Sequence, residues 1–148
     1  MYFRYLTESD MDDLAHTLTA CYTQHIQYTG QACRDWFKTT GLEVVGIFSN
    51  LDEMLGFLFF NILPDNIYYA KDCSVIPQCR AVLQAREIAE TGFKWFIDQG
   101  AEILRIETCA GDYKVLNLYT GLGFKIVDYI QNRVNFEDGV VLEVNLGR

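Results

Sequence analysis

Residues 80–99 are the part of the sequence that most restricts the fold. Their apolar side chains recur every three or four positions, which predicts an amphipathic helix, and Gly100 follows as a stop signal. Runs rich in β-branched and aromatic residues lie on both sides, at residues 67–75 and 101–108, and Pro77 ends the first run. A strand, a long helix and a second strand in this order predict two parallel strands joined by a crossover helix. We therefore expect a β-α-β unit built into a sheet.

Shorter elements precede and follow this unit. We expect further strands at residues 2–6, 42–48, 54–63, 124–130 and 140–146, and further helices at residues 10–26, 31–40 and 112–120. Gly30 is expected to stop the first helix, and residues 131–139 are expected to form a polar loop. The order β-α-α-β-β-β-α-β-α-β-β predicts an α+β fold with a mixed central sheet and helices on both faces. Because 148 residues with 50% hydrophobic content suffice for one core, residues 1–148 are expected to form a single domain.

Charge and cysteine content argue against several classes of protein. The net charge is −8 and no run of Lys or Arg occurs, so we expect no nucleic acid partner. No stretch approaches the roughly 18 apolar residues of a membrane span, and the N-terminus lacks a basic segment followed by an apolar one. The five cysteines form no C-x-x-C pair, and neither His16 nor His25 stands at a zinc-ligand spacing. These features predict a reduced, cytoplasmic protein with neither a metal site nor a membrane association.

Two motifs follow the two strands of the β-α-β unit. The first is Val75-Ile76-Pro77-Gln78-Cys79-Arg80-Ala81-Val82-Leu83-Gln84-Ala85, and the second runs from Asp112 through Val115 to Leu118-Tyr119-Thr120-Gly121-Leu122-Gly123-Phe124. Together with the element order they resemble the GCN5-related N-acetyltransferase (GNAT) superfamily over nearly the whole chain. In that family the corresponding patterns are V-x-P-x-x-R-G-x-G-x-G/A and N-x-x-A-x-x-L-Y-x-x-x-G-F.

The resemblance implies a loop that binds the pyrophosphate of acetyl-CoA, the co-substrate of the family. Backbone N–H groups at a helix N-terminus attract a pyrophosphate, and glycines let the backbone approach it closely. Here Ala81 and Leu83 replace two of the glycines, and Asp112 replaces an asparagine that bonds the pantetheine arm. The alternative is that residues 80–85 form only the first turn of a core helix, with Leu83 buried. The residues implied in coenzyme binding are Val75, Arg80, Ala81, Val82, Leu83, Ala85 and Asp112.

The resemblance also implies an acid and a base. The family's acid is often the tyrosine of the L-Y-x-x-x-G-F motif, here Tyr119. Bacterial ribosomal-protein N-acetyltransferases of this family place a glutamate base twelve residues before that tyrosine, which corresponds to Glu107. Asp72 is a second candidate for the base. As alternatives, Glu107 is an exposed strand residue paired with Arg105 or Lys125, and Tyr119 is a packed aromatic residue.

Two classes of function follow from these observations. In the first, the protein transfers acetyl from acetyl-CoA directly to an amine, with Glu107 as base and Tyr119 as acid. The acceptor is then a small-molecule amine or a protein amine, and the acidic surface suits a cation such as a polyamine or a basic peptide tail. In the second, the chain is a catalytically silent binding or assembly module, since it is also weakly similar to a GNAT-like head-assembly product of short-tailed phages. A channel beside Leu83 between the two parallel strands distinguishes the two classes. The sequence is also compatible with a homodimer.

Overall fold

The computed structural model describes residues 1–22, 27–134 and 136–147, and its elements follow the expected order. Three single turns of 3₁₀ helix accompany the longer elements, at Glu8–Asp10, Pro64–Asn66 and Pro77–Cys79. The strands and helices are β1 (Tyr2–Tyr5), α1 (Met11–Cys21), α2 (Gly30–Thr39), β2 (Glu43–Phe48), β3 (Met54–Leu63), β4 (Ile67–Val75), α3 (Val82–Asp98), β5 (Ile103–Cys109), α4 (Tyr113–Gly121), β6 (Lys125–Val134) and β7 (Glu137–Asn145).

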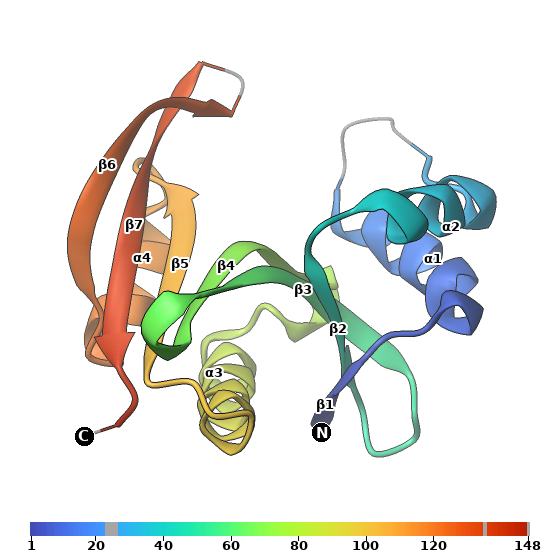
Figure 1. Ribbon diagram of the computed structural model, residues 1–148, viewed down its shortest axis with the longest axis horizontal. Coiled ribbons are helices and arrows are strands. Elements are labelled where there is room, and N and C mark those ends of the chain that lie inside the picture. The colour runs from blue at the N-terminus through green and yellow to red at the C-terminus, as the bar shows by residue number, and fades with distance from the viewer. Residues whose placement is uncertain (23–26, 135, 148) are drawn as a thin grey trace.

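All described strands belong to one mixed sheet in the order β1-β2-β3-β4-β5-β7-β6 (Figure 1). β4 and β5 pair in parallel, and every other neighbouring pair in this sheet is antiparallel. α3 connects the two parallel strands, so the expected β-α-β unit is confirmed.

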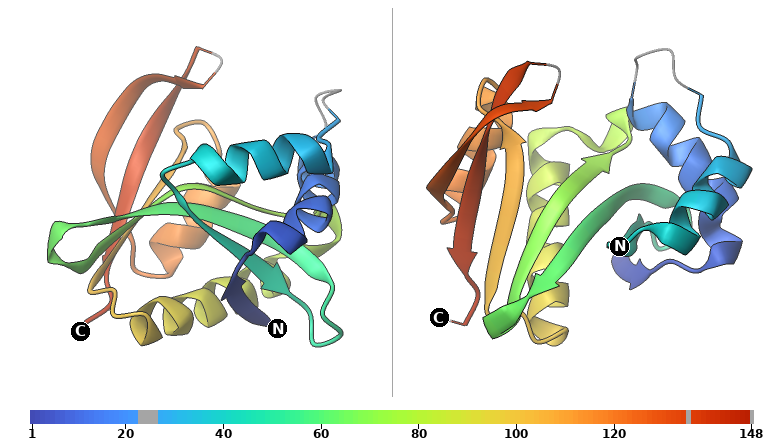
Figure 2. Two further views of the ribbon diagram at one scale, coloured as in Figure 1. Left: turned by 45° about the vertical axis from the view of Figure 1, so that its right-hand side comes forward. Right: turned by 45° about the horizontal axis from the view of Figure 1, so that its top comes forward.

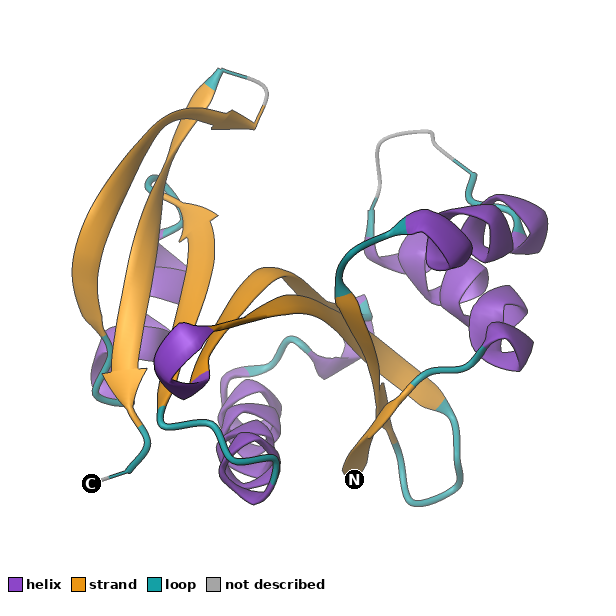
Figure 3. Ribbon diagram, in the orientation of Figure 1, coloured by secondary structure: helices purple, strands orange, loops and turns teal. Residues whose placement is uncertain are grey.

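Helices cover both faces of the sheet, as expected (Figure 3). α3 and α4 pack on one face, where Leu58 and Phe60 of β3 belong to the buried cluster. α1 and α2 pack on the other face, where Phe57 and Phe59 of β3 are buried. Successive residues of β3 enter different cores because side chains alternate between the two faces of a strand. The α+β fold class expected from the sequence is therefore confirmed.

The first helix is shorter than expected. α1 ends at Cys21, and Tyr22 has an extended backbone with φ −106° and ψ 111°. His25 and Ile26, which the apolar spacing places at the end of this helix, lie outside the described residues.

The expectation that Gly30 stops the first helix is wrong, because Gly30 is the first residue of α2. The hydroxyl of Thr29 accepts a hydrogen bond from the backbone N–H of Ala32 at 3.1 Å. This bond satisfies one of the donors at the start of a helix, so Thr29 acts as an N-cap and sets where α2 begins.

The polar loop expected at residues 131–139 is mostly strand. β6 continues to Val134 and β7 begins at Glu137, and these two residues are paired. β6 is an edge strand whose residues are mostly exposed, and such a strand carries polar side chains on both faces. Its polarity therefore resembled that of a loop.

Among the described helices, none combines the length and apolarity that a membrane span needs. The described residues also contain no group of three or more His, Cys, Asp or Glu side chains arranged to hold a metal ion.

Candidate active site

The parallel strands β4 and β5 stay paired for only part of their length. Their pairing runs from Ile67 opposite Ile103 to Ala70 opposite Ile106. Beyond this point β4 pairs with β3 and β5 pairs with β7, while β4 and β5 run apart (Figure 2). The facing edges of residues 71–75 and 107–109 thus carry backbone polar groups without a strand partner in the described structure. We call this opening the fork.

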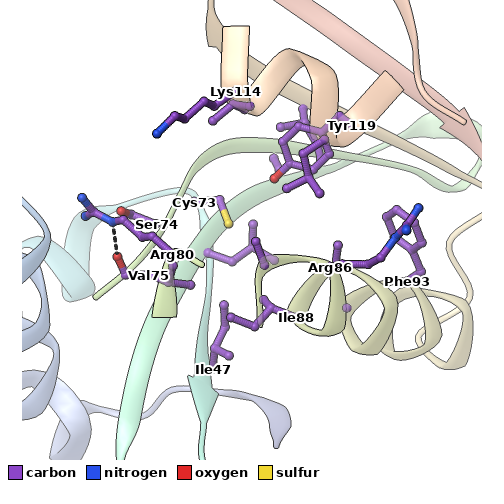
Figure 4. A pocket seen from close by; sticks show the side chains of 18 of the residues that line it. Ile47, Cys73, Ser74, Val75, Arg80, Arg86, Ile88, Phe93, Lys114 and Tyr119 are labelled. Atoms are coloured by element: carbon purple, nitrogen blue, oxygen red, sulfur yellow. Dashed lines mark hydrogen bonds between the residues drawn. The ribbon is translucent and has the colours of Figure 1, made fainter. Parts of the chain in front are cut away.

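A cavity of about 940 Å³ lies on the α3 and α4 side of the fork. Its wall is formed by β4, by most of the length of α3 and by α4, together with core residues beneath them (Figure 4). The fold thus brings the two sequence motifs together around one space. Predicted site residues in its lining are Val75, Arg80, Ala81, Ala85, Asp112 and Tyr119.

The beginning of α3 offers backbone donors beside this cavity. The N-cap residue, Ala81, makes no side-chain capping bond. The N–H of Ala85 bonds to the carbonyl oxygen of Ala81 at 2.8 Å, so the N–H groups of residues 82–84 precede the first helical bond. Ala81 and Ala85 both line the cavity. Because the dipole at this end of a helix is positive, the arrangement suits a phosphate group.

Three basic side chains, Arg80, Arg86 and Lys114, also line the large cavity, although the chain carries a net charge of −8. Arg80 is held in place by hydrogen bonds of 3.0 Å from its Nε to the carbonyl oxygen of Val75 and from its Nη2 to that of Cys21. Both acceptors are neutral, so the positive charge of Arg80 is not cancelled by these contacts. The lining is locally cationic, as a polyanionic ligand requires.

Leu83 does not fill the channel. Its side chain is 83% exposed and does not line the cavity, so the alternative in which it is buried in the core is wrong. The reason is its position in the first turn of α3, where it lies on the helix surface away from the sheet. Leu83 therefore has only its backbone N–H group to contribute to coenzyme binding. The side chain of Val82, also predicted to bind the coenzyme, lies outside those that the structure describes.

Tyr119 points from α4 into the large cavity, with its hydroxyl directed toward Cys73 on β4 (Figure 4). Its ring packs edge to face against Phe124 at a centroid distance of 5.1 Å. Gly123 has φ +97°, a conformation that glycine adopts without strain, and it makes the turn that brings Phe124 beside the ring. The alternative that Tyr119 is a packed aromatic residue is thus correct for its ring, whereas its hydroxyl faces the cavity.

Desolvation controls the ionisation of both polar groups at this point. It raises the pKa of the Tyr119 hydroxyl, and the neighbouring Cys73 raises that pKa further. Desolvation also raises the pKa of the Cys73 thiol to about 12, with the negative charge of Asp72 adding to the effect. Both groups are therefore protonated at neutral pH, and Tyr119 is a hydrogen-bond donor for an atom placed in the cavity.

Glu107 does not line the large cavity. It belongs to a polar cluster built from β4, β5 and β6. Its Oε1 accepts hydrogen bonds from the Tyr69 hydroxyl at 2.9 Å and from Lys71 Nζ at 3.4 Å. Its Oε2 lies 3.6 Å from Arg133 Nε, and Arg133 Nη2 donates to the carbonyl oxygen of Lys71 at 3.2 Å. Arg133 thus reaches across the fork from β6 to β4.

The alternative of an exposed Glu107 paired with Arg105 or Lys125 is wrong. The Glu107 side chain is only 13% exposed, and its partners are the cations of the cluster just described. Arg105 pairs instead with Glu143 at 2.7 Å, because β7 lies directly beside β5 in the sheet.

Asp72 lines a second, smaller cavity of about 470 Å³ between β3, β4 and the helices α1 and α2. The Tyr22 hydroxyl lies 2.8 Å from both carboxylate oxygens of Asp72. Burial raises the pKa of Asp72, although the hydrogen bond from Tyr22 and the charge of Arg133 act in the opposite direction. Asp72 is therefore a desolvated carboxylate close to the fork.

Several residues of the large cavity were not predicted from the sequence. Lys114 and Arg86 had a signal that was not used, since each is a cation within the first turns of a predicted helix next to a motif residue. Cys73 and Ser74 had no such signal, because their position depends on where β4 leaves β5. The additional polar lining residues are Cys73, Ser74, Arg86, Lys114 and Asn117.

Comparison with solved structures identifies the fold. No protein-family model matches the chain, and no curated protein matches its sequence. The ribosomal-protein-S18-alanine N-acetyltransferase of Escherichia coli is 15% identical with a TM-score of 0.75, covering 99% of this chain and 94% of that one. A spermidine N-acetyltransferase SpeG chimera from Vibrio cholerae and hSSAT is 10% identical with a TM-score of 0.80, covering 99% and 96%. YncA from Salmonella typhimurium, solved with its cofactor acetyl-CoA, is 13% identical with a TM-score of 0.70, covering 100% and 95%.

These matches show that the chain has the fold of the GCN5-related N-acetyltransferases. They give no support to the resemblance to a phage head-assembly protein. At identities of 10–15% the likeness concerns the fold, and the chemistry has to be argued from the residues at the fork.

Proposed function

We propose that this protein is an acetyl-CoA-dependent N-acetyltransferase that transfers an acetyl group directly to an amine. The observation that carries the proposal is the large cavity at the fork, whose lining combines a cationic, donor-rich helix start with a protonated Tyr119. A thioester attached to a long polyanion needs both features, one for its phosphates and one for its leaving sulfur.

The residues around the cavity suit the parts of acetyl-CoA, which supplies the acetyl thioester. The N–H groups at the start of α3, with Arg80 and Lys114, are assigned to the phosphates. The open edges of β4 and β5 suit the amides of the pantetheine arm, because an extended chain bonds to strand edges. Asp112 serves first as the N-cap of α4, where it accepts a hydrogen bond from the Val115 N–H at 3.3 Å. It thereby supports the helix that carries Tyr119.

Tyr119 is assigned as the hydrogen-bond donor to the leaving sulfur. Acetyl transfer forms a carbon–nitrogen bond and breaks the carbon–sulfur bond, and the departing thiolate takes up a proton. Of the two protons that the substrate ammonium loses, one balances the proton gained by sulfur and the other leaves through the base. A tyrosine whose pKa is raised stays protonated and keeps its donor available throughout.

Two carboxylates are candidates for the base. Glu107, which the twelve-residue spacing predicts, has one oxygen engaged by Tyr69 and Lys71 and the other 3.6 Å from Arg133 Nε, so its charge is already paired with two cations. Asp72 makes hydrogen bonds only with a neutral hydroxyl among the described side chains. The surroundings of the Asp72 carboxylate therefore favour Asp72 as the base. The role of Glu107 as the base stays a prediction.

Release of free thiol from acetyl-CoA in the presence of a panel of primary amines tests the proposal. Tyr119→Phe is expected to lower turnover by about 10²–10⁴, the range for a lost acid, with little change in acetyl-CoA affinity. Tyr113→Phe is the matched control, because Tyr113 is 74% exposed on the same helix. A folded protein that binds acetyl-CoA but acetylates no amine would instead support the silent binding module.

A further inference from the structure

The two cavities lie on opposite faces of the same stretch of β4. Cys73 lines the large cavity and Asp72 lines the small one, because adjacent residues of a strand point to opposite faces. In a closed sheet this strand and its neighbour would separate the two spaces. Here the pairing with β5 has already ended at Ala70, so the fork leaves the sheet open beside both residues. A group held at Asp72 therefore lies next to the position where a thioester would react.

The small cavity is lined by aromatic and other apolar residues and by one charged side chain. Tyr22, Tyr28 and Trp36 line it from the α1 and α2 side, and Phe59 lines it from β3. The ring centroids of Trp36 and Phe59 are 4.7 Å apart, and those of Tyr22 and Tyr28 are 6.2 Å apart. Among the described residues of this lining, Asp72 is the only one with a formal charge.

The charge of Asp72 is not neutralised within the described part of the chain. No Lys or Arg there comes within ion-pair distance of Asp72, whose hydrogen-bond partner is the Tyr22 hydroxyl. The cation that lowers its pKa, Arg133, is engaged by Glu107 and by the carbonyl oxygen of Lys71. A desolvated carboxylate without a cation is costly, and a bound ammonium group would remove that cost.

We propose that the small cavity selects the acetyl acceptor as a compact monoamine, with a single ammonium group at Asp72 and an apolar or aromatic body among Tyr22, Tyr28, Trp36 and Phe59. This inference rests on the proposed acetyl transfer and specifies its acceptor. The aromatic faces contribute twice, since they bury the apolar body and attract the cation.

The same features disfavour the polyamine or basic peptide that the acidic composition suggests. The cavity offers one carboxylate, so a second ammonium group would enter an apolar lining without a partner. A volume of about 470 Å³ is near the lower end for ligand pockets, which also favours a short body.

Asp72 has a place in the chemistry of such an acceptor. The ammonium gives one proton to the Asp72 carboxylate, and the freed nitrogen lone pair forms the bond to the acetyl carbon as the carbon–sulfur bond breaks. The nitrogen then loses a second proton, which balances the one taken up by the thiolate, and the proton on Asp72 passes to solvent. The products are an amide, a thiol and one proton.

Binding and turnover of matched ligands test the inference. With coenzyme A present, 2-phenylethylamine is expected to bind at least tenfold more tightly than 2-phenylethanol, which lacks the ammonium charge. It is also expected to bind more tightly than spermidine, which carries more ammonium groups than the cavity can pair. Titration is followed by calorimetry and by the fluorescence of Trp36, with Trp36→Phe identifying its signal against that of Trp95. The acetylation rates of the two amines should follow the same order.

Asp72→Asn is expected to abolish the preference for the amine over the alcohol while keeping an acceptor for the Tyr22 hydroxyl. Tyr22→Phe removes that hydrogen bond but keeps the charge, so the preference should survive. Asp65→Asn, an exposed carboxylate in the turn before β4, is the control and should change neither affinity.

Acetylation of spermidine or a basic peptide in preference to the monoamine would overturn the inference and leave the proposed function intact. So would an amine preference that survives in Asp72→Asn and is lost in Glu107→Gln. Failure of the proposed function is separate, since it appears as the absence of acetyl transfer to every amine.

Discussion

Leu83 occupies the position where the coenzyme loop of this fold carries a glycine, yet its side chain is 83% exposed and outside the cavity. A glycine matters only where a side chain would meet the ligand or the backbone. The substitution visible in the sequence is therefore compatible with a functional loop, a conclusion that depends on the direction in which one side chain points.

We expect Leu83→Gly to leave the dissociation constant for acetyl-CoA within about twofold of the wild-type value. The free energy of unfolding should fall by no more than about 1 kcal/mol, because only helix propensity is lost and no core contact. Isothermal titration and urea denaturation measure the two quantities, with Leu83→Ala as a control that keeps helix propensity. A tenfold gain in affinity in the glycine variant would show that Leu83 obstructs the ligand.

At the scale of single elements, the start of α1 illustrates how local signals become structure. Thr7 and Asp10 form a capping box, in which the Thr7 N–H donates to the Asp10 carboxylate at 2.7 Å. Arg4 on β1 donates two hydrogen bonds of 2.9 Å to the same carboxylate. One buried carboxylate thus ties the first strand to the beginning of the first helix, and the Arg4 guanidinium lowers the pKa of Asp10 to about 2.

This contact predicts an acid-sensitive contribution to stability. The pKa of Asp10 is lower in the folded state than in the unfolded chain, so the stabilisation is complete above the unfolded value near 4 and is lost as pH falls toward 2. Asp10→Asn should lower the free energy of unfolding by about 1–2 kcal/mol at pH 7, and the difference from wild type should shrink below pH 4.

Urea denaturation between pH 2.5 and 7 measures this difference, with Asp13→Asn, an exposed carboxylate of α1, as the control. A difference between Asp10→Asn and wild type that stays constant over this pH range would show that the contact does not depend on the charge of Asp10.

At the scale of the whole molecule, the fork divides the sheet into two parts joined through β4 and β5. A ligand spanning the fork would connect β4 and the beginning of α3 with α4, which lies further along the chain beyond β5 (Figure 1). Such a ligand binds the folded state alone and must raise its stability.

Millimolar acetyl-CoA, at about a hundredfold excess over the dissociation constant, should stabilise the fold by about 2.7 kcal/mol. For a domain of this size, the melting temperature should rise by about 5–10 °C. Differential scanning calorimetry measures the shift, and pantetheine is the control, because it lacks the phosphates that the start of α3 attracts. An unchanged melting temperature with every acyl-CoA would contradict coenzyme binding at the fork.

Much of the fold could be predicted from the sequence, because periodicity and turn residues act locally. The apolar spacing of residues 80–99 predicts α3, and the strand-like runs beside it predict the parallel pair of β4 and β5. The Tyr119 motif is also local, because Gly123 and Phe124, on which it depends, follow the tyrosine closely in the sequence. The errors fell where local signals are ambiguous, at the end of the first helix and in the polar edge strand β6.

Tertiary structure alone decided the electrostatics of the candidate site. Tyr22 and Asp72 are 50 residues apart in the sequence. Their hydrogen bond forms because α1 ends before Tyr22 and the fold places this residue beside β4. Glu107 and Tyr119 follow the predicted spacing of twelve residues, yet only one of them faces the large cavity. Sequence spacing determines which side chains are near one another along the chain. The ionic partners and the solvent exposure of a carboxylate depend on which strands become its neighbours, and long-range packing determines those.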